Sequence, residues 1–146
     1  MCGGMEFKRR RPLVGGLGLI EAEEETVRVL FPNPKAALLV DEAADRWLPW
    51  GRRSEQPGDW PEGGWARAES LDKAFWTRWD PVERLLHPAR WMEKDPARRS
   101  HWFDLRGALR AIQLLKAPGT PLYVVTVPAP PDFLAIHPRM PEIVQG

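Results

Sequence analysis

The residue best placed to do chemistry is Cys2, the single cysteine of the 146-residue chain, one peptide bond from its N-terminus. Removal of Met1, which is usual before a small second residue, would leave Cys2 with an α-amine and a thiol on neighbouring carbons. This 1,2-aminothiol reacts with aldehydes, because the amine forms an imine and the thiolate then closes a thiazolidine ring. Ordinary pKa values of about 7.7–8.0 for the amine and about 8.5 for the thiol make both nucleophiles available near neutral pH. The alternative interpretation is a frayed terminus with an incidental cysteine.

An aldehyde-trapping site also needs groups that move protons, and a glutamate or a histidine can do so. Glu93 stands between Met92 and Lys94 at the end of an apolar segment, which predicts partial burial. His137 directly precedes Pro138, and the proline restricts the backbone of His137 and helps to fix its direction. Taken singly, both residues are also compatible with a structural role.

The sequence argues against metal and phosphate-loop chemistry. His87, His101 and His137 are far apart, and the lone cysteine offers no Cys-x-x-Cys pair. The glycine-rich residues 15–18 lack the lysine and the preceding strand of a nucleotide-binding loop. We therefore expect no metal and no cofactor.

The composition is that of a soluble globular protein, with 43% apolar and 28% charged residues. The length fits one domain, residues 1–146. A single cysteine suits a reducing compartment, and no apolar run approaches the roughly 20 residues that span a bilayer. We expect a monomer in the cytoplasm, associated with the nucleoid if the partner is DNA.

The distribution of charge and of tryptophan points to a nucleic-acid partner more than the net charge of +1 does. Cations concentrate at residues 8–11, 52–53 and 98–99, and residues 21–25 form a separate acidic patch, so a basic face is possible. Solvated surface charge is the other interpretation. Several of the eight tryptophans, among them Trp50 and Trp65, stand among glycines, prolines and arginines, where exposed stacking platforms for bases are also found.

The pattern along the chain predicts an α+β fold with a dominant, largely antiparallel β-sheet and short peripheral helices. Residues 2–18 are glycine-rich and basic without clear periodicity, which favours a loop or at most a short strand. Residues 52–64 are turn-forming throughout and predict a surface loop. Residues 71–78 form the expected helix, and 108–116 are compatible with either helix or strand. The expected strands are residues 26–31, 36–40, 46–50, both sides of the proline within 82–93, 101–105 and 122–127.

Taken in order, five segments resemble the SOS response-associated peptidase (SRAP) family, whose members begin Met-Cys-Gly and crosslink to abasic sites in single-stranded DNA. Residues 66–69 are similar to the end of the family's Asn-Ala-Arg-x-Glu motif, and residues 88–93 to its Pro-Ala-x-Gly-Phe-Tyr-Glu segment. Residues 136–141 resemble its Ile-His-x-Arg-Met-Pro ending. The other two segments are the Met-Cys-Gly start and Trp50-Gly51, which precedes a polar stretch.

The resemblance implies a covalent thiazolidine between Cys2 and the ring-opened sugar aldehyde, with possible autoproteolytic peptidase or lyase activity. It also implies that Glu93 transfers protons and holds the amine, and that His137 assists opening of the sugar ring. Arg67 would contact the DNA backbone, and Trp50 with Gly51 would shape the groove where the strand bends.

Two departures from the family pattern leave other functions open. Gly4 replaces the family's arginine, and Trp65 replaces the asparagine of Asn-Ala-Arg. An indole offers only an N–H donor, and Asn33 in a Pro-Asn-Pro turn is a candidate substitute for that asparagine. The alternatives are a non-covalent single-stranded DNA-binding module and a cysteine peptidase, although Cys2 and His137 lack an evident orienting third residue.

Overall fold

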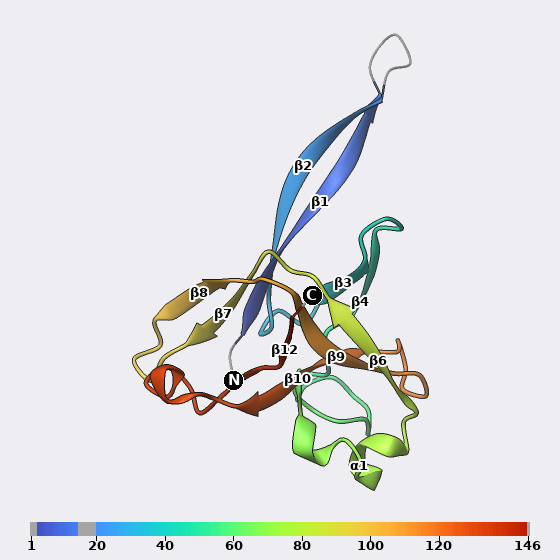
Figure 1. The fold of residues 1–146 in the computed structure, drawn as a ribbon. Coiled ribbons are helices and arrows are strands. Elements are labelled where there is room, and N and C mark those ends of the chain that lie inside the picture. Colours follow the sequence, from blue (N-terminus) through green and yellow to red (C-terminus); the bar gives the residue numbers. More distant parts are fainter. Residues whose placement is uncertain (1–2, 15–19, 146) are drawn as a thin grey trace.

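The computed structural model describes residues 3–14 and 20–145 of the chain, and in this part antiparallel β-strands dominate (Figure 1). The helices in it are short: the 3₁₀ turns η1 (Ala68–Ser70) and η2 (Pro131–Phe133) and the single α-helical turn α1 (Ala74–Thr77). The predicted combination of a largely antiparallel sheet with short helices is thereby confirmed at this level. The strands are β1 (Gly4–Val14), β2 (Ile20–Leu30), β3 (Ala37–Asp41), β4 (Arg46–Pro49), β5 (Trp65–Arg67), β6 (Pro81–Leu86), β7 (Arg90–Lys94), β8 (Ser100–Asp104), β9 (Ala108–Leu114), β10 (Leu122–Pro128), β11 (Arg139–Pro141) and β12 (Ile143–Val144).

The strands form two larger sheets and a hairpin. The first sheet has the order β2-β1-β7-β8, and the hairpin is β3-β4. The second has the order β11-β10-β9-β12, with β6 added beside β9 and β5 beside β10. The β5–β10 pair is parallel, and the other pairs between strands are antiparallel. No helix among the described residues is long and apolar enough to cross a membrane.

Strand β10 is buried on both faces and separates two apolar clusters. Leu122 and Val124 pack into the larger cluster, which fills the space between the two sheets and includes Phe7. Tyr123 and Val125 point the opposite way, into a smaller cluster that Trp76 of α1 covers. The unbroken apolar run of residues 122–125 therefore reflects burial on both faces, which explains why this strand is the most evident one in the sequence.

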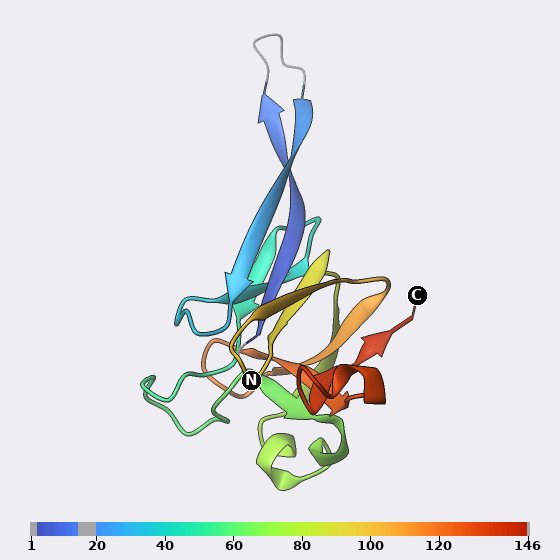
Figure 2. The same cartoon turned by 90° about the vertical axis from the view of Figure 1, so that its left-hand side faces the viewer.

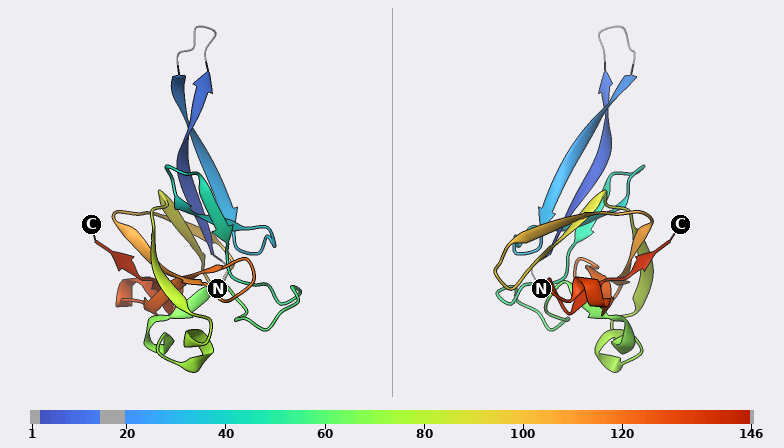
Figure 3. Two further views of the ribbon diagram at one scale, coloured as in Figure 1. Left: turned by 90° about the vertical axis from the view of Figure 1, so that its right-hand side faces the viewer. Right: turned by 60° about the vertical axis from the view of Figure 1, so that its left-hand side comes forward.

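The largest surprise is β1, because the sequence favoured a loop or at most a short strand there. Together with β2 it forms a long ribbon that projects from the body of the protein (Figures 1, 2 and 3). Its register places the basic residues 9–11 opposite the acidic residues 23–25. Arg9 Nε lies 3.1 Å from Glu25 Oε2, and Lys8 Nζ lies 3.5 Å from Glu24 Oε1. Glu24 and Glu25 therefore do not form an acidic patch separate from the basic run, since they pair with Lys8 and Arg9 across the ribbon.

The structure also settles one open alternative and corrects one further expectation. Residues 108–116, ambiguous in the sequence, contain strand β9, which is buried between β6 and β10. The helix expected over residues 71–78 is reduced to the four residues of α1, and Trp76 is its buried anchor. Asp80, with φ of 56°, follows and turns the chain into β6.

A buried carboxylate ties the strands of the first sheet together. Glu6 on β1 is 6% exposed and accepts hydrogen bonds from Arg90 of β7, at 2.8 Å, and from Arg28 of β2, at 2.6 and 3.0 Å. Both guanidiniums also lie over the Trp102 ring. The hydrogen bonds from Arg90, and then those from Arg28, lower the pKa of Glu6 from 4.5 to about 2 against the opposing effect of burial.

Glu6→Gln should therefore lower the free energy of unfolding near neutral pH by about 1–2 kcal/mol, a value reduced by the partial exposure of both arginines. A carboxylate with a lowered pKa stabilises the fold above its unfolded pKa, and this stabilisation is lost as pH falls from 4.5 toward about 2. Urea unfolding of both proteins across this range measures the effect. Equal stability near neutral pH would contradict it.

Candidate nucleic-acid interface

Gly3 is the first described residue, and its surroundings define the N-terminal end of the candidate site. Its carbonyl accepts the Phe31 N–H at 2.9 Å. A Cβ atom on Gly3 would lie 2.4 and 2.5 Å from Cζ2 and Cη2 of Trp65, and 3.5 Å from the Met92 carbonyl oxygen. The backbone thus passes directly against the Trp65 indole, which only glycine permits. Cys2 itself lies outside the described residues.

Glu93 lies beside this N-terminal segment. Gly4 pairs with Met92 in the β1–β7 ladder, so the same register places Glu93 opposite Gly3. The Glu93 side chain is almost fully buried, at 1% exposure, which is deeper than the sequence predicted. Its Oε1 accepts the Lys94 N–H at 3.2 Å. A buried carboxylate at this position is suited to exchange protons with a group on the N-terminal residues.

Trp65 also lines a hollow of about 570 Å³. Trp65 and Arg67 come from β5, Thr126 from β10, and Arg139 from the start of β11. The fold brings three predicted site residues together here, although they come from segments about 70 residues apart in sequence. The hollow is lined by Trp65, Arg67, Thr126, His137, Pro138 and Arg139.

The His137 ring is held by the main chain. Its Nδ1 lies 3.0 Å from both the amide nitrogen and the carbonyl oxygen of Arg139. The backbone therefore fixes the ring, and a substrate proton would be handled by Nε2. Burial lowers the pKa of His137, so the neutral ring is favoured near neutral pH.

Arg139 is a site residue to which sequence reasoning assigned no role. Its guanidinium binds the Glu69 carboxylate in a fork, at 2.6 and 3.1 Å, and also donates to the side-chain and main-chain oxygens of Thr126. The bond from Arg139 lowers the pKa of Glu69. Glu69 and Arg139 belong to the motif segments at residues 66–69 and 136–141, and this membership is the sequence signal that could have identified them. Nothing in the sequence marks Thr126.

Trp50 and Gly51 lie beneath the site rather than on its surface. Trp50 is fully buried, and its Nε1 donates to the Gly64 carbonyl at 3.0 Å. Its ring packs edge-on against Trp65 with centroids 5.3 Å apart. Gly51 has φ of 60°, and a Cβ there would lie 2.0 Å from the Gly63 carbonyl oxygen. Trp50 is thus no stacking platform for a base and instead supports Trp65 from below, while Gly51 permits the close approach of the Gly63 backbone.

The basic pair Arg52 and Arg53 also turns inward. Arg53 is 6% exposed and donates to the carbonyls of Phe31 and Trp50, and desolvation lowers its pKa. The Arg52 guanidinium donates to two carbonyls of its own loop, at 2.8 Å each. These arginines hold the loop of residues 52–64 to the core, so they contribute little to a basic surface.

A second hollow, of about 310 Å³, shares Trp65 and Arg67 with the first. Side chains of η1 and α1 contribute to its lining, and no carboxylate does. It is lined by Trp65, Arg67, Ser70, Lys73, Phe75 and Trp76. The two hollows therefore adjoin along β5, and three cations, Arg67, Lys73 and Arg139, lie along them.

Comparison of the chain with protein-family models, curated proteins and solved structures finds no match. Among the described residues, no group of three or more His, Cys, Asp or Glu side chains could hold a metal ion.

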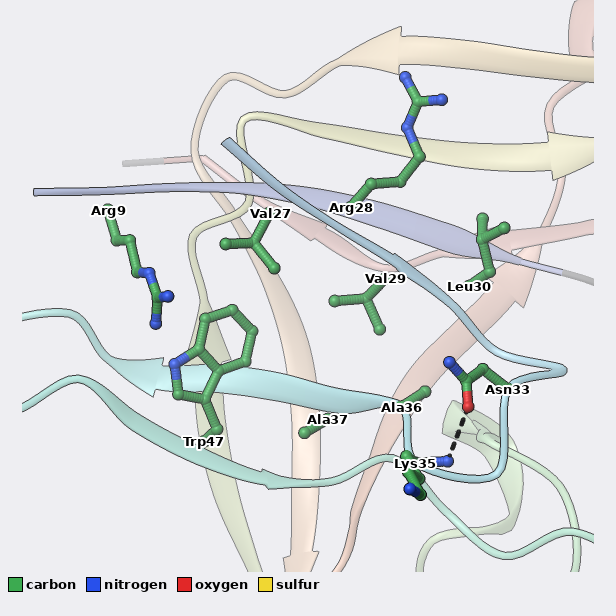
Figure 4. Close-up of a pocket in the computed structure, with 10 residues that line it drawn as sticks. All are labelled: Arg9, Val27, Arg28, Val29, Leu30, Asn33, Lys35, Ala36, Ala37 and Trp47. Carbon is green, nitrogen blue, oxygen red and sulfur yellow. Dashed lines mark hydrogen bonds between the residues drawn. The ribbon is translucent and has the colours of Figure 1, made fainter. Parts of the chain in front are cut away.

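Asn33 is not brought to these hollows. It lines a separate pocket of about 350 Å³ between β2 and the β3-β4 hairpin, together with Trp47 and Lys35 (Figure 4). Its Oδ1 accepts the Lys35 N–H at 3.0 Å and so closes the turn after β2. This placement gives Asn33 a turn-forming role and offers no support for its use in place of the asparagine that Trp65 replaces.

Proposed function

We propose that this chain is an SRAP-type domain that binds single-stranded DNA and captures abasic sites covalently through Cys2. The observation that carries the proposal is the convergence at Gly3. The residue that follows Cys2 lies against Trp65 and opposite the buried Glu93, and Trp65 also lines the hollow that contains Arg67 and His137.

The reaction follows from the 1,2-aminothiol and an aldehyde. The Cys2 amine adds to the aldehyde carbon of the ring-opened sugar, and the resulting carbinolamine loses water to give an imine. The thiolate then adds to the imine carbon, the nitrogen takes up a proton, and the five-membered thiazolidine closes. Overall, aldehyde and aminothiol give thiazolidine and one water, without an oxidant or reductant.

Glu93 and His137 have separate tasks in this scheme. Glu93 takes a proton from the attacking amine and returns one to the leaving hydroxyl, which suits a carboxylate that is buried beside the N-terminal segment. His137 assists opening of the sugar ring by proton transfer through Nε2, since Nδ1 is engaged by Arg139.

The side chains that line the two hollows suit binding of single-stranded DNA. Phosphates of a bound strand would meet Arg67, Lys73 and Arg139, and the half-buried Trp65 ring offers a surface on which a base can stack. A second candidate function is non-covalent binding alone. It is favoured by Trp65 itself, because the indole fills the space against Gly3 and its buried Nε1 has no hydrogen-bond partner among the described residues.

Arg67→Ala should weaken binding of a single-stranded oligonucleotide and reduce the slope of log affinity against log salt by about 0.7, the value for one lost phosphate contact. Within the described part of the chain Arg67 interacts electrostatically with Glu69 but forms no ion pair or side-chain hydrogen bond, so its removal breaks no direct polar contact there. Fluorescence anisotropy over a salt series measures both quantities. Arg98→Ala is the matched control, because Arg98 lines neither hollow. An unchanged slope would exclude a phosphate contact for Arg67.

The proposed function as a whole is tested by incubating the protein with a single-stranded oligonucleotide that contains one abasic site. A denaturant-stable adduct that requires Cys2 is expected. Salt-sensitive binding without any adduct would select the non-covalent alternative.

A further inference from the structure

Phe75 is the most exposed large apolar side chain of the described residues, at 61% exposure. It stands on α1, a single helical turn, at the rim of the second hollow. The side chains around it are those of a ligand site more than of a random surface: two further aromatic rings, two cations and a hydroxyl, without a carboxylate.

The Phe75 ring is held from below by a rigid aromatic stack. It meets the Trp76 ring edge-on, with centroids 5.2 Å apart and an interplanar angle of 89°. Trp76 is 4% exposed and packs in turn on Tyr123, with centroids 4.9 Å apart. The buried Tyr123 hydroxyl donates to the Pro61 carbonyl. Phe75 is therefore presented on a fixed base, which reduces the entropy lost when a ligand stacks on it.

The charges around Phe75 complement a phosphate. Lys73 immediately precedes α1, and Arg67 lies where the two hollows meet. Neither forms an ion pair within the described part of the chain. A planar apolar group attached to an anion matches an aromatic face beside a lysine, and a nucleotide whose base is unpaired has this chemistry.

We propose that the hollow beside Phe75 is a nucleobase subsite, in which one unpaired base next to the abasic site stacks on Phe75 while its phosphate lies near Lys73. This inference rests on the proposed function and adds to it the position of a flanking nucleotide. It predicts a preference for single strands at this position, because a base paired within a duplex cannot place its face on the ring.

The test uses an oligonucleotide with a tetrahydrofuran residue as the abasic analogue. The analogue has no aldehyde, so binding stays non-covalent and affinities can be compared directly. A second set of probes lacks one further base at each flanking position in turn. Affinities for wild type, Phe75→Ala and Phe75→Trp are measured by fluorescence anisotropy, with Leu85→Ala as a control that removes another exposed apolar side chain.

Phe75→Ala should weaken binding of the probe with all flanking bases by about 5- to 150-fold, the range for one stacked base. Removing one particular flanking base should weaken wild type to the same degree and should leave Phe75→Ala unaffected, so that the two losses are not additive. Phe75→Trp should bind as tightly as wild type or more tightly, and Leu85→Ala should bind normally.

Additive losses at every flanking position, or normal binding by Phe75→Ala, would overturn the subsite. If the wild type crosslinks an aldehyde-containing oligonucleotide while Phe75→Ala binds normally, only the subsite fails. If the wild type neither crosslinks nor binds the probe, the proposed function fails with it.

Discussion

Glu93→Gln is expected to slow crosslinking to an abasic-site oligonucleotide by about 10²- to 10⁴-fold, the usual contribution of a positioned proton-transfer group. Glutamine keeps the size and hydrogen-bonding outline of the side chain but cannot accept a proton from the amine. Glu93 is 1% exposed and lies opposite Gly3 in the register, so bulk water is poorly placed to substitute for it. The rate is measured by quenching into denaturant and separating the adduct on a gel.

Glu83→Gln on β6 is the matched control, because the Glu83 carboxylate is exposed and faces Arg110 rather than the site. It should crosslink at the wild-type rate. Thermal unfolding of the Glu93 variant shows whether a slower reaction arises from a lost fold. A folded Glu93→Gln protein that reacts as fast as wild type would remove Glu93 from the mechanism.

Gly3→Ala is expected to slow crosslinking by about 100-fold, because a displacement of about 1 Å from reactive geometry has this cost. The added methyl group would lie 2.4 Å from Trp65 Cζ2, so either the indole or the N-terminal backbone must move. Both adjoin Gly3, the residue bonded to Cys2.

The double variant Gly3→Ala with Trp65→Asn tests this explanation, since it removes the ring atoms that the methyl group meets. It should recover most of the crosslinking rate that Gly3→Ala alone loses. If the double variant is as slow as the single one, contact with Trp65 is not the reason for the requirement for glycine.

Much of the β-structure can be predicted from local patterns, and β1 shows where such patterns fail. Strand β10 carries an apolar run buried on both faces, which a sequence displays directly. Strand β1 alternates only over residues 5–8 and continues with cations and a proline, so most of its own residues do not favour a strand. It is stabilised by carboxylates on β2, for example Glu25 opposite Arg9, and this pairing is visible only once the register is known.

The residues of the candidate site likewise divide into those that sequence motifs indicate and those that only the fold reveals. Trp65, Arg67 and His137 were identified from motifs that resemble one family, and the fold brings them to one hollow. The basic pair at residues 52–53 is misleading, since a run of cations in a sequence does not show which way the side chains turn. Arg53 is bound to carbonyls in the interior.

The cations that do line the hollows, such as Lys73, are isolated in the sequence and carry no signal of their own. Phe75 was missed for a related reason. An apolar residue inside an expected helix is ordinarily assigned to the core, and only the packing of Trp76 beneath it leaves the Phe75 ring exposed.

The most direct test of the central claim is the intact mass of the protein after incubation with a single-stranded oligonucleotide that contains one abasic site. We expect a denaturant-stable species with the summed mass of oligonucleotide and protein lacking Met1, less one water. The same species should be absent for Cys2→Ser. Protein that lacks Met1 and binds the oligonucleotide, yet gives no such species, would contradict covalent capture through Cys2.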